Sequence, residues 1–257
     1  MMNNTTRPHI AQIETTTKCV GLCGFCPHAC VIQNRPEFMS IETFSLVLER
    51  MEAAGGFNAV YLFGNGDPFC DPRLVELAAM VPYKYHVMLY TTLGMKLTKE
   101  MVKMSRRCDI VLSAAPLSKA GQALRNENLK AISVTEVHAV ADERCILRGM
   151  GLAAATGTGI KVFPLHNWLG QVKTLMPVNA GTCDRVGNEM YVLTDGTVTL
   201  CCMDGTGEYR LGSLITDSVE DVYSRVSTQR YLNKEHGLPG CDRCTIGGDL
   251  KELINED

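Results

Sequence analysis

The chain of 257 residues lacks any long apolar run, and no stretch reaches the roughly 18 apolar residues that a membrane-spanning helix needs. Its first ten residues also lack the apolar segment of a secretory signal, so we expect a cytoplasmic protein. Aromatic residues make up only 6% of the chain, with one tryptophan, Trp168, and the net charge is −3. This charge gives no support for binding long nucleic acid, although a modified nucleoside substrate stays open.

Cysteine, in contrast, is abundant, with 12 residues in the chain. Because a reducing cytosol disfavours disulfides, metal or cluster ligation is the leading explanation. Most of these cysteines fall into two groups, one near each end: Cys19, Cys23 and Cys26, then Cys183, Cys201, Cys202, Cys241 and Cys244. The others are scattered singly and read as small buried apolar residues: Cys30, Cys70, Cys108 and Cys145.

The first group has the spacing C-x3-C-x2-C. Three thiolates on one short loop can hold three irons of a [4Fe–4S] cube and leave the fourth iron open to a small molecule, whereas ferredoxin runs carry a fourth cysteine. The spacing therefore predicts a reactive cluster. A zinc knuckle that also uses His28 and Cys30 is the alternative by ligand type.

The first two thirds of the chain alternate short β-like runs with amphipathic helical stretches. We expect strands over residues 9–14, 58–63, 86–90, 109–114, 133–140 and 159–165. We expect helices over 41–54 after a Ser40 cap, from an Asp71-Pro72 start to residue 80, from Thr98 onward, over 119–131 and over 142–155. Repeated β–α units predict a parallel sheet, and six are too few to close an eight-stranded barrel. The expected fold is α/β, an open partial (β/α)6 TIM-type barrel.

The pattern changes after residue 170. Residues 191–202 read as a β-hairpin turning at Asp195-Gly196, and a helix is expected over 218–233 before the final C-x2-C pair. We therefore divide the chain into a barrel, residues 1–170, and a small domain of a β-hairpin plus a helix, residues 171–257.

Three motifs in the barrel together resemble the radical S-adenosylmethionine superfamily. They are the cysteine run with Phe25 before its third cysteine, the Gly64-Asn65-Gly66-Asp67-Pro68 turn after the second strand, and Tyr90-Thr91-Thr92-Leu93-Gly94 after the third. The turn is similar to the Gly-Gly-Glu-Pro motif of the superfamily, with Asn65 and Asp67 substituted. The order and strand placement of the motifs fit over residues 9–168.

The resemblance implies a [4Fe–4S] cluster on Cys19, Cys23 and Cys26 that binds and cleaves S-adenosylmethionine. The 5′-deoxyadenosyl radical so formed takes a hydrogen atom from a small polar substrate, and a flavodoxin- or ferredoxin-type protein donates the electron. Residues implied in binding S-adenosylmethionine are Phe25, Gly64, Asn65, Gly66, Asp67, Thr92 and Ser113. Glycine suits a turn that approaches a ligand closely, whereas Ser113 could equally cap a strand end.

The second cysteine group resembles the short "twitch" version of the SPASM extension, which implies a second [4Fe–4S] cluster. Its implied ligands are Cys183, Cys201, Cys241 and Cys244. Cys201 is preferred to Cys202 by its spacing from Gly196, and adjacent strand residues face opposite sides. A zinc ribbon on the same four cysteines is the alternative by ligand type.

The chain also resembles the S-adenosylmethionine-dependent aminocyclitol dehydrogenases in length, in both cysteine groups and in Asn167-Trp168-Leu169-Gly170. Such a resemblance implies dehydrogenation with the second cluster as electron acceptor. An arginine proposed as the base in those enzymes is replaced here by Trp168, which cannot accept a proton. His138, Glu136 and His166 are the candidate bases.

Other functions stay open at this point. An epimerase returns a hydrogen atom from a cysteine, for which Cys30, Cys70, Cys145 and Cys202 are equal candidates by sequence. An isomerase returns the hydrogen atom from 5′-deoxyadenosine. Either enzyme could act on a sugar, peptide or nucleoside. A third class is a non-enzyme, an iron–sulfur electron carrier or redox sensor. The open iron and the large barrel argue against this class, because an electron carrier does not need them.

Overall fold

A computed structural model describes residues 8–28, 37–173, 183–235 and 237–245. These residues form one nine-stranded sheet in the order β6-β5-β4-β3-β2-β1-β7-β8-β9. The strands are β1 Ile10–Ile13, β2 Ala59–Tyr61, β3 His86–Thr91, β4 Asp109–Ser113, β5 Glu136–Val140, β6 Ile160–Phe163, β7 Glu189–Val192, β8 Thr197–Thr199 and β9 Arg210–Ser213. The helices are α2 Ile41–Ala54, α3 Leu74–Met80, α4 Lys99–Ser105, α5 Lys119–Asn128, α6 Glu143–Thr156, α7 Arg185–Asn188, α8 Val219–Ser224 and α9 Val226–Leu232, with short 3₁₀ turns η1 Pro68–Cys70 and η2 Cys241–Arg243.

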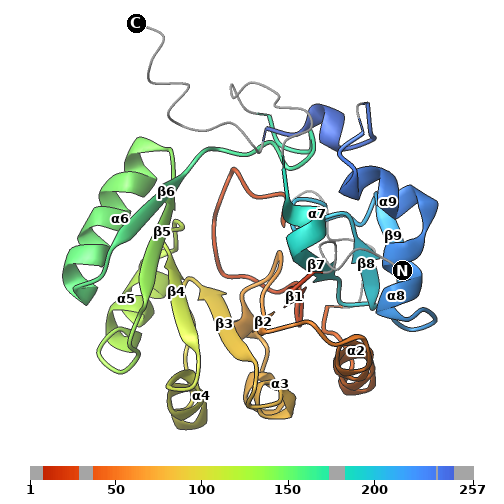
Figure 1. Ribbon diagram of the computed structural model, residues 1–257. Coiled ribbons are helices and arrows are strands. Elements are labelled where there is room, and N and C mark those ends of the chain that lie inside the picture. Colours follow the sequence, from red (N-terminus) through yellow and green to blue (C-terminus); the bar gives the residue numbers. More distant parts are fainter. Residues whose placement is uncertain (1–7, 29–36, 174–182, 236, 246–257) are drawn as a thin grey trace, which may run out of the picture.

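Strands β1 to β6 follow one another across the sheet in chain order, and each pair is parallel. Figure 1 shows them as a curved wall with helices α2 to α6 on its convex side. The two ends of the wall do not meet, because β6 is an edge strand. The expected open partial barrel is therefore confirmed.

The sheet continues beyond the barrel. Strand β7 pairs in parallel with β1, with Gln12 opposite Tyr191, and β8 and β9 add antiparallel strands. The predicted hairpin is present as β7 and β8, and Gly196 takes the positive φ of 80° that its turn requires. Because both parts share one sheet, the boundary at residue 170 stays a prediction.

Three helix starts agree with the sequence analysis and one differs. The side chains of Ser40, Thr98 and Asp142 accept from the backbone three residues on and open α2, α4 and α6. The helix expected from Asp71-Pro72 begins later, at Leu74, without a side-chain cap. The buried Asp71 carboxylate accepts from the Arg73 backbone N–H at 2.9 Å and from its guanidinium at 2.8 Å, and these bonds fix the turn before α3.

The single helix expected over residues 218–233 is also wrong. It is divided into α8 and α9 at Arg225, whose backbone is extended with φ −59° and ψ 138°. The guanidinium of Arg225 donates to the Leu211 carbonyl at 2.7 Å and pairs with Asp217 at 2.9 Å. These bonds tie the break to β9, a tertiary effect that the local pattern does not contain.

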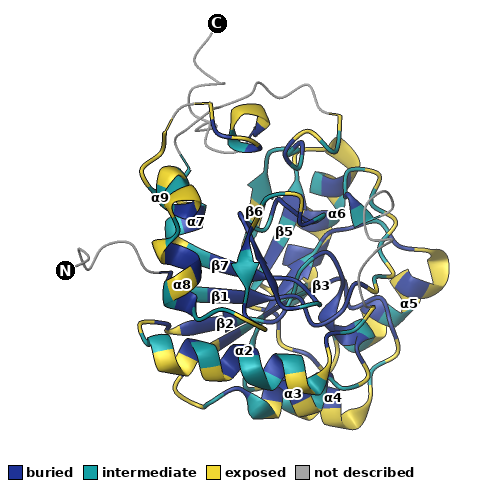
Figure 2. Ribbon diagram, turned by 90° about the vertical axis from the view of Figure 1, so that its right-hand side faces the viewer, coloured by how far each residue is buried: buried dark blue, intermediate teal, exposed yellow. Residues whose placement is uncertain are grey.

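Alternate strand residues face the helices and form the core. Val60, Leu89, Leu112 and Val137 are fully buried, and Figure 2 shows the strands dark under helices whose outer faces are exposed. The opposite, concave face carries the cysteine loop. Among the described residues, no helix is long and apolar enough to cross a membrane.

The cap of α2 gives a test of the fold. Replacing Ser40 with alanine removes the hydrogen bond from the Thr43 amide, 3.0 Å long, and should lower the free energy of unfolding by about 1 kcal/mol. Urea unfolding measures this. Ser45→Ala in the same helix is the control, and an equal loss from both variants would contradict the cap.

Candidate active site and iron–sulfur centre

The first cysteine group lies on the loop that follows β1, at the carboxyl edge of the parallel strands. The Leu22 amide donates to the Pro116 carbonyl at 2.9 Å and fixes this loop to the chain after β4. A Cβ built on Gly21 would lie 3.3 Å from Cys19 Sγ and 3.5 Å from Cys23 Sγ. The two sulfurs therefore flank one backbone point, as ligands of a shared group must.

Burial and neighbouring charge both act on these thiols. Burial, with the nearby Asp67 carboxylate, raises the pKa of Cys19 to about 12, and burial with Cys26 raises the pKa of Cys23 to about 12. Thiolates are needed to ligate metal, so a positively charged metal group must displace the protons. The site is suited to a cationic cluster and poorly suited to a free reactive thiolate.

Two arginines lie behind this loop, Arg125 buried and Arg148 half-buried. Arg125 donates to the carbonyls of Thr92 and Ala115 at 2.8 and 2.9 Å, and Arg148 donates to that of Ala114 at 2.6 Å. Burial lowers the pKa of Arg125 to about 10. The positive charge of these arginines offsets the negative charge of thiolate ligands that lie in a low dielectric.

The glycine turn after β2 packs against the chain itself. A Cβ on Gly66 would lie 2.1 Å from the Thr16 carbonyl oxygen, and one on Gly64 would lie 2.7 Å from Glu14 Cβ. We expected these glycines to allow close approach of a ligand. In the structure they allow close approach of the strand end that leads into the cysteine loop, and the Asp67 amide donates to the Lys18 carbonyl at 2.7 Å.

The polar residues of this turn are bound within the protein. Asp67 accepts at one oxygen from Thr91 Oγ1 at 2.8 Å and at the other from the amide and hydroxyl of Thr92 at 2.7 and 2.8 Å. The Asn65 amide group donates to Glu14, Tyr191 and the Gly205 carbonyl. Contact of the Asn65 and Asp67 side chains with S-adenosylmethionine stays a prediction. In the structure, the hydrogen bonds of these two side chains fix the turn.

The candidate catalytic positions are His138, Glu136, His166 and Trp168. The first two lie together on β5. His138 Nε2 and Glu136 Oε2 are 2.6 Å apart, and Lys161 Nζ is 3.0 Å from the same oxygen. Burial opposes ionisation of Glu136, but the bonds from His138 and Lys161 outweigh it and lower its pKa. Burial lowers the pKa of His138 despite Glu136, which leaves a neutral imidazole available as a base.

The other two candidates lie apart from this pair. Burial, with the charge of Arg185, lowers the pKa of His166 to about 4. Trp168 donates its indole N–H to the Phe25 carbonyl at 3.0 Å, so it supports the cysteine loop. Next to it, the Asn167 amide group donates to the Arg243 carbonyl, and the Asn167 backbone N–H donates to Thr245 Oγ1 at 3.0 Å. This segment therefore touches both cysteine regions.

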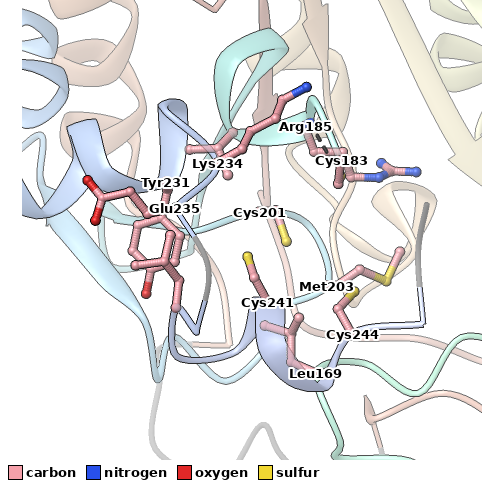
Figure 3. Close-up of a pocket in the computed structure, with 12 residues that line it drawn as sticks. Leu169, Cys183, Arg185, Cys201, Met203, Tyr231, Lys234, Glu235, Cys241 and Cys244 are labelled. Atoms are coloured by element: carbon pink, nitrogen blue, oxygen red, sulfur yellow. Dashed lines mark hydrogen bonds between the residues drawn. The ribbon is translucent and has the colours of Figure 1, made fainter. Parts of the chain in front are cut away.

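The second cysteine group surrounds a pocket between the hairpin and α9. Cys183, Cys201, Cys241 and Cys244 all line it, and Figure 3 shows Cys201 and Cys241 directed into the same space. Leu169 and Met203 close it with apolar surface. These four are the residues we expected to ligate the second cluster.

The neighbouring Cys202 faces elsewhere. It is not among the residues that line the pocket, and its Sγ accepts from Arg185 Nη1 at 3.1 Å. The same guanidinium reaches Glu189 at 3.3 Å. This geometry supports Cys201 as the ligand, but β8 ends at Thr199, so the two cysteines face apart in the turn after the strand and not by strand alternation.

The sulfur arrangement also bears on the zinc alternatives. Within the part of the chain that the structure describes, no three His, Cys, Asp or Glu side chains converge on a single metal position. Zinc requires its ligands about 2.0–2.3 Å from one ion. His28, the proposed knuckle ligand, lies 2.6 Å from the Thr17 carbonyl, and Cys30 is outside the described residues.

Comparison with known proteins agrees with this geometry. Residues 183–245 match the family model of SPASM, an iron–sulfur cluster-binding domain. This stretch is therefore similar to a SPASM domain. No curated protein sequence matches the chain.

Similar solved structures cover both parts. BtrN in complex with AdoMet and 2-DOIA has a TM-score of 0.67 at 14% identity, covering 92% of each chain. Native anSMEcpe with bound AdoMet has a TM-score of 0.66 at 11% identity, covering 92% of this chain and 88% of its own. SuiB of Streptococcus suis bound to precursor peptide SuiA has a TM-score of 0.67 at 11% identity, covering 98% and 74%. The chain shares the fold of these structures.

Several residues that build the site were not expected from the sequence. Arg125, Arg148 and Arg185 bond to residues of the cysteine regions, and Glu14 accepts from the Asn65 backbone N–H at 2.9 Å. Only Glu14 carried a usable signal, because it is an acidic residue at the end of an apolar strand.

Gly66 provides a test of the turn. Gly66→Ala would place a methyl against the Thr16 carbonyl and should destabilise the protein by more than about 2 kcal/mol. Thermal unfolding measures the change. Gly24→Ala, which meets nothing within 4 Å on the cysteine loop, is the control and should be nearly neutral.

The choice between adjacent cysteines gives a second test. Cys201→Ser should remove roughly four irons per chain, because Cys201 lines the pocket. Cys202→Ser should keep them, since Cys202 faces Arg185. The iron content of anaerobically reconstituted protein distinguishes the two cysteines. Loss of iron in Cys202→Ser but not in Cys201→Ser would show that Cys202 is the ligand.

Proposed function

We propose that the chain is a radical S-adenosylmethionine oxidoreductase that removes hydrogen from a small substrate bound on the concave face of its barrel. The observation that carries the proposal is the pairing of two different sulfur sites. One has three thiols on a single loop at the carboxyl edge of the sheet, and the other has four thiols around one pocket. Three ligands leave a cluster open to a small molecule, whereas four close it.

The donor sets suit the two groups. Cys19, Cys23 and Cys26 would hold the first cluster, and Cys183, Cys201, Cys241 and Cys244 the second. When bound, the clusters and S-adenosylmethionine supply a 5′-deoxyadenosyl radical and an electron acceptor. The chain would supply orientation through the residues proposed to hold S-adenosylmethionine: the backbone of the turn at 64–66, Thr92 and Ser113. The AdoMet bound in BtrN and anSMEcpe supports this assignment.

Dehydrogenation also requires a base. Trp168 cannot serve, since its N–H is a donor that already bonds to Phe25. His138 is the better candidate because its pKa is lowered and Glu136 fixes one ring nitrogen at 2.6 Å. We propose His138 as the group that accepts the substrate proton, with Glu136 orienting it.

Epimerisation or isomerisation is the second candidate. The observation that favours it is Cys145, a buried thiol within electrostatic reach of Cys23 that could return a hydrogen atom. Solvent deuterium found in a product isomeric with the substrate would favour the epimerase; a ketone or aldehyde product would favour the dehydrogenase.

The proposed function is tested by reductive cleavage of S-adenosylmethionine. Anaerobically reconstituted protein with dithionite should release 5′-deoxyadenosine. A triple replacement of Cys19, Cys23 and Cys26 by alanine should abolish this and leave roughly four of roughly eight irons. Cys108→Ala, a thiol packed against Met104, is the control and should retain both. Cleavage by the triple variant, or none by the parent chain, would contradict the proposal.

A further inference from the structure

A row of aromatic rings crosses the concave face of the barrel. Its members, called here the aromatic row, are Tyr61, Phe63, Tyr90, His138 and Phe163. The centroids of successive rings are 5.9, 5.5, 5.5 and 4.8 Å apart. The row thus extends without a break from β2 to β6, spanning residues more than a hundred positions apart in the chain.

Strand alternation places the row opposite the core. Leu62, Leu89 and Val137, each next in sequence to a member, are fully buried against the helices. The ring-bearing residues are half-buried. Rings that served only to fill a core would be covered on this side too, so the row is a partly open surface.

The row is also unusual for this chain. Aromatic residues make up 6% of the sequence, and the buried core is mainly aliphatic. Four of the few phenylalanines and tyrosines nevertheless gather in one line on one face. Packing alone does not require this concentration, whereas binding a flat ligand does.

The row lies beside the proposed source of the radical. Tyr90 is within electrostatic reach of Cys23 and Cys26, and it shares a hydrogen bond with Ser113. At the other side of Tyr90, His138 is bonded to Glu136, with Lys161 adjacent. From Phe63 onward, successive rings are tilted by 36°, 56° and 54°. A ligand on the row would therefore meet ring edges and tilted ring faces, with the polar groups of Glu136 and Lys161 near its β5–β6 end.

We propose that the aromatic row is the substrate-binding surface and that it takes a substrate carrying a planar aromatic ring. This inference rests on the proposed function and narrows it. Stacking of a flat ring on aromatic side chains tolerates differences in ring chemistry and commonly changes affinity by about tenfold per contact. A saturated ring such as an aminocyclitol gains less, because it has no π face.

Binding of small probes to the reconstituted, full-length protein tests the proposal. Calorimetry compares N-acetyltyrosinamide with its saturated analogue, N-acetylcyclohexylalaninamide, and guanosine with methyl riboside. At least one aromatic probe should bind about tenfold more tightly than its non-aromatic partner. Which pair shows the difference tells whether the ring belongs to an aromatic amino acid or to a nucleobase.

Variants locate the binding. Phe163→Leu on the edge strand β6 and Tyr90→Leu should each weaken the aromatic probe about tenfold, and Tyr90→Phe should keep the affinity. Tyr83→Leu, a tyrosine 88% exposed and away from the row, is the matched control. The iron content of each variant shows whether it has folded. If Tyr90→Leu does not fold, the affinity of Phe163→Leu is the test.

Three results would overturn the proposal: equal binding of both members of each pair, unchanged affinity in Phe163→Leu, or a matching loss of S-adenosylmethionine affinity. The last would mean that the row holds the adenine of the cofactor. Release of 5′-deoxyadenosine without substrate is measured on the same samples. Its absence in the parent chain would refute the proposed function, while the probe comparison still decides the aromatic row.

Discussion

The contact on which the site depends is the docking of the turn at 64–68 onto the strand end before the cysteine loop. Gly66 lies so close to the Thr16 carbonyl that no side chain fits between them, and the Asp67 amide bonds to Lys18. The Asp67 carboxylate then reaches across to Thr91 and Thr92 at the end of β3. Three neighbouring strand ends are held by one short turn. The cysteine loop starts from this fixed edge, so its thiols are placed by backbone contacts and not by the loop alone.

A second constraint joins the two sulfur sites. Strand β7 pairs with β1, so the hairpin that carries Cys201 extends the same sheet that carries the first cysteine loop. The segment at 167–170 adds side-chain bonds to both regions, through Trp168 to Phe25 and through Asn167 to Thr245. Relative position of the two sites is thus set by a shared sheet and a shared loop, which suits chemistry that moves electrons between them.

The repeating elements could be predicted because their signals are local. Alternating apolar residues, the Ser40 cap and the cysteine spacings each depend on a few neighbouring positions. The helix expected over 218–233 is divided because Arg225 binds the Leu211 carbonyl on β9. The start of α3 is displaced because Asp71 binds Arg73, which also donates to the Met39 carbonyl 34 residues away. In the site, the cysteine groups were predicted from their spacing, whereas the partners of Arg125, Asn65 and Asp67 lie on other elements of the fold.

The bonds of the 167–170 segment have a consequence for biosynthesis. Phe25 emerges from the ribosome early, whereas Trp168, which bonds to it, emerges 143 residues later. At a synthesis rate of about 5–20 residues per second, the early loop waits at least about seven seconds for the segment that braces it. The cysteine loop therefore gains this contact only after well over half of the chain has been made.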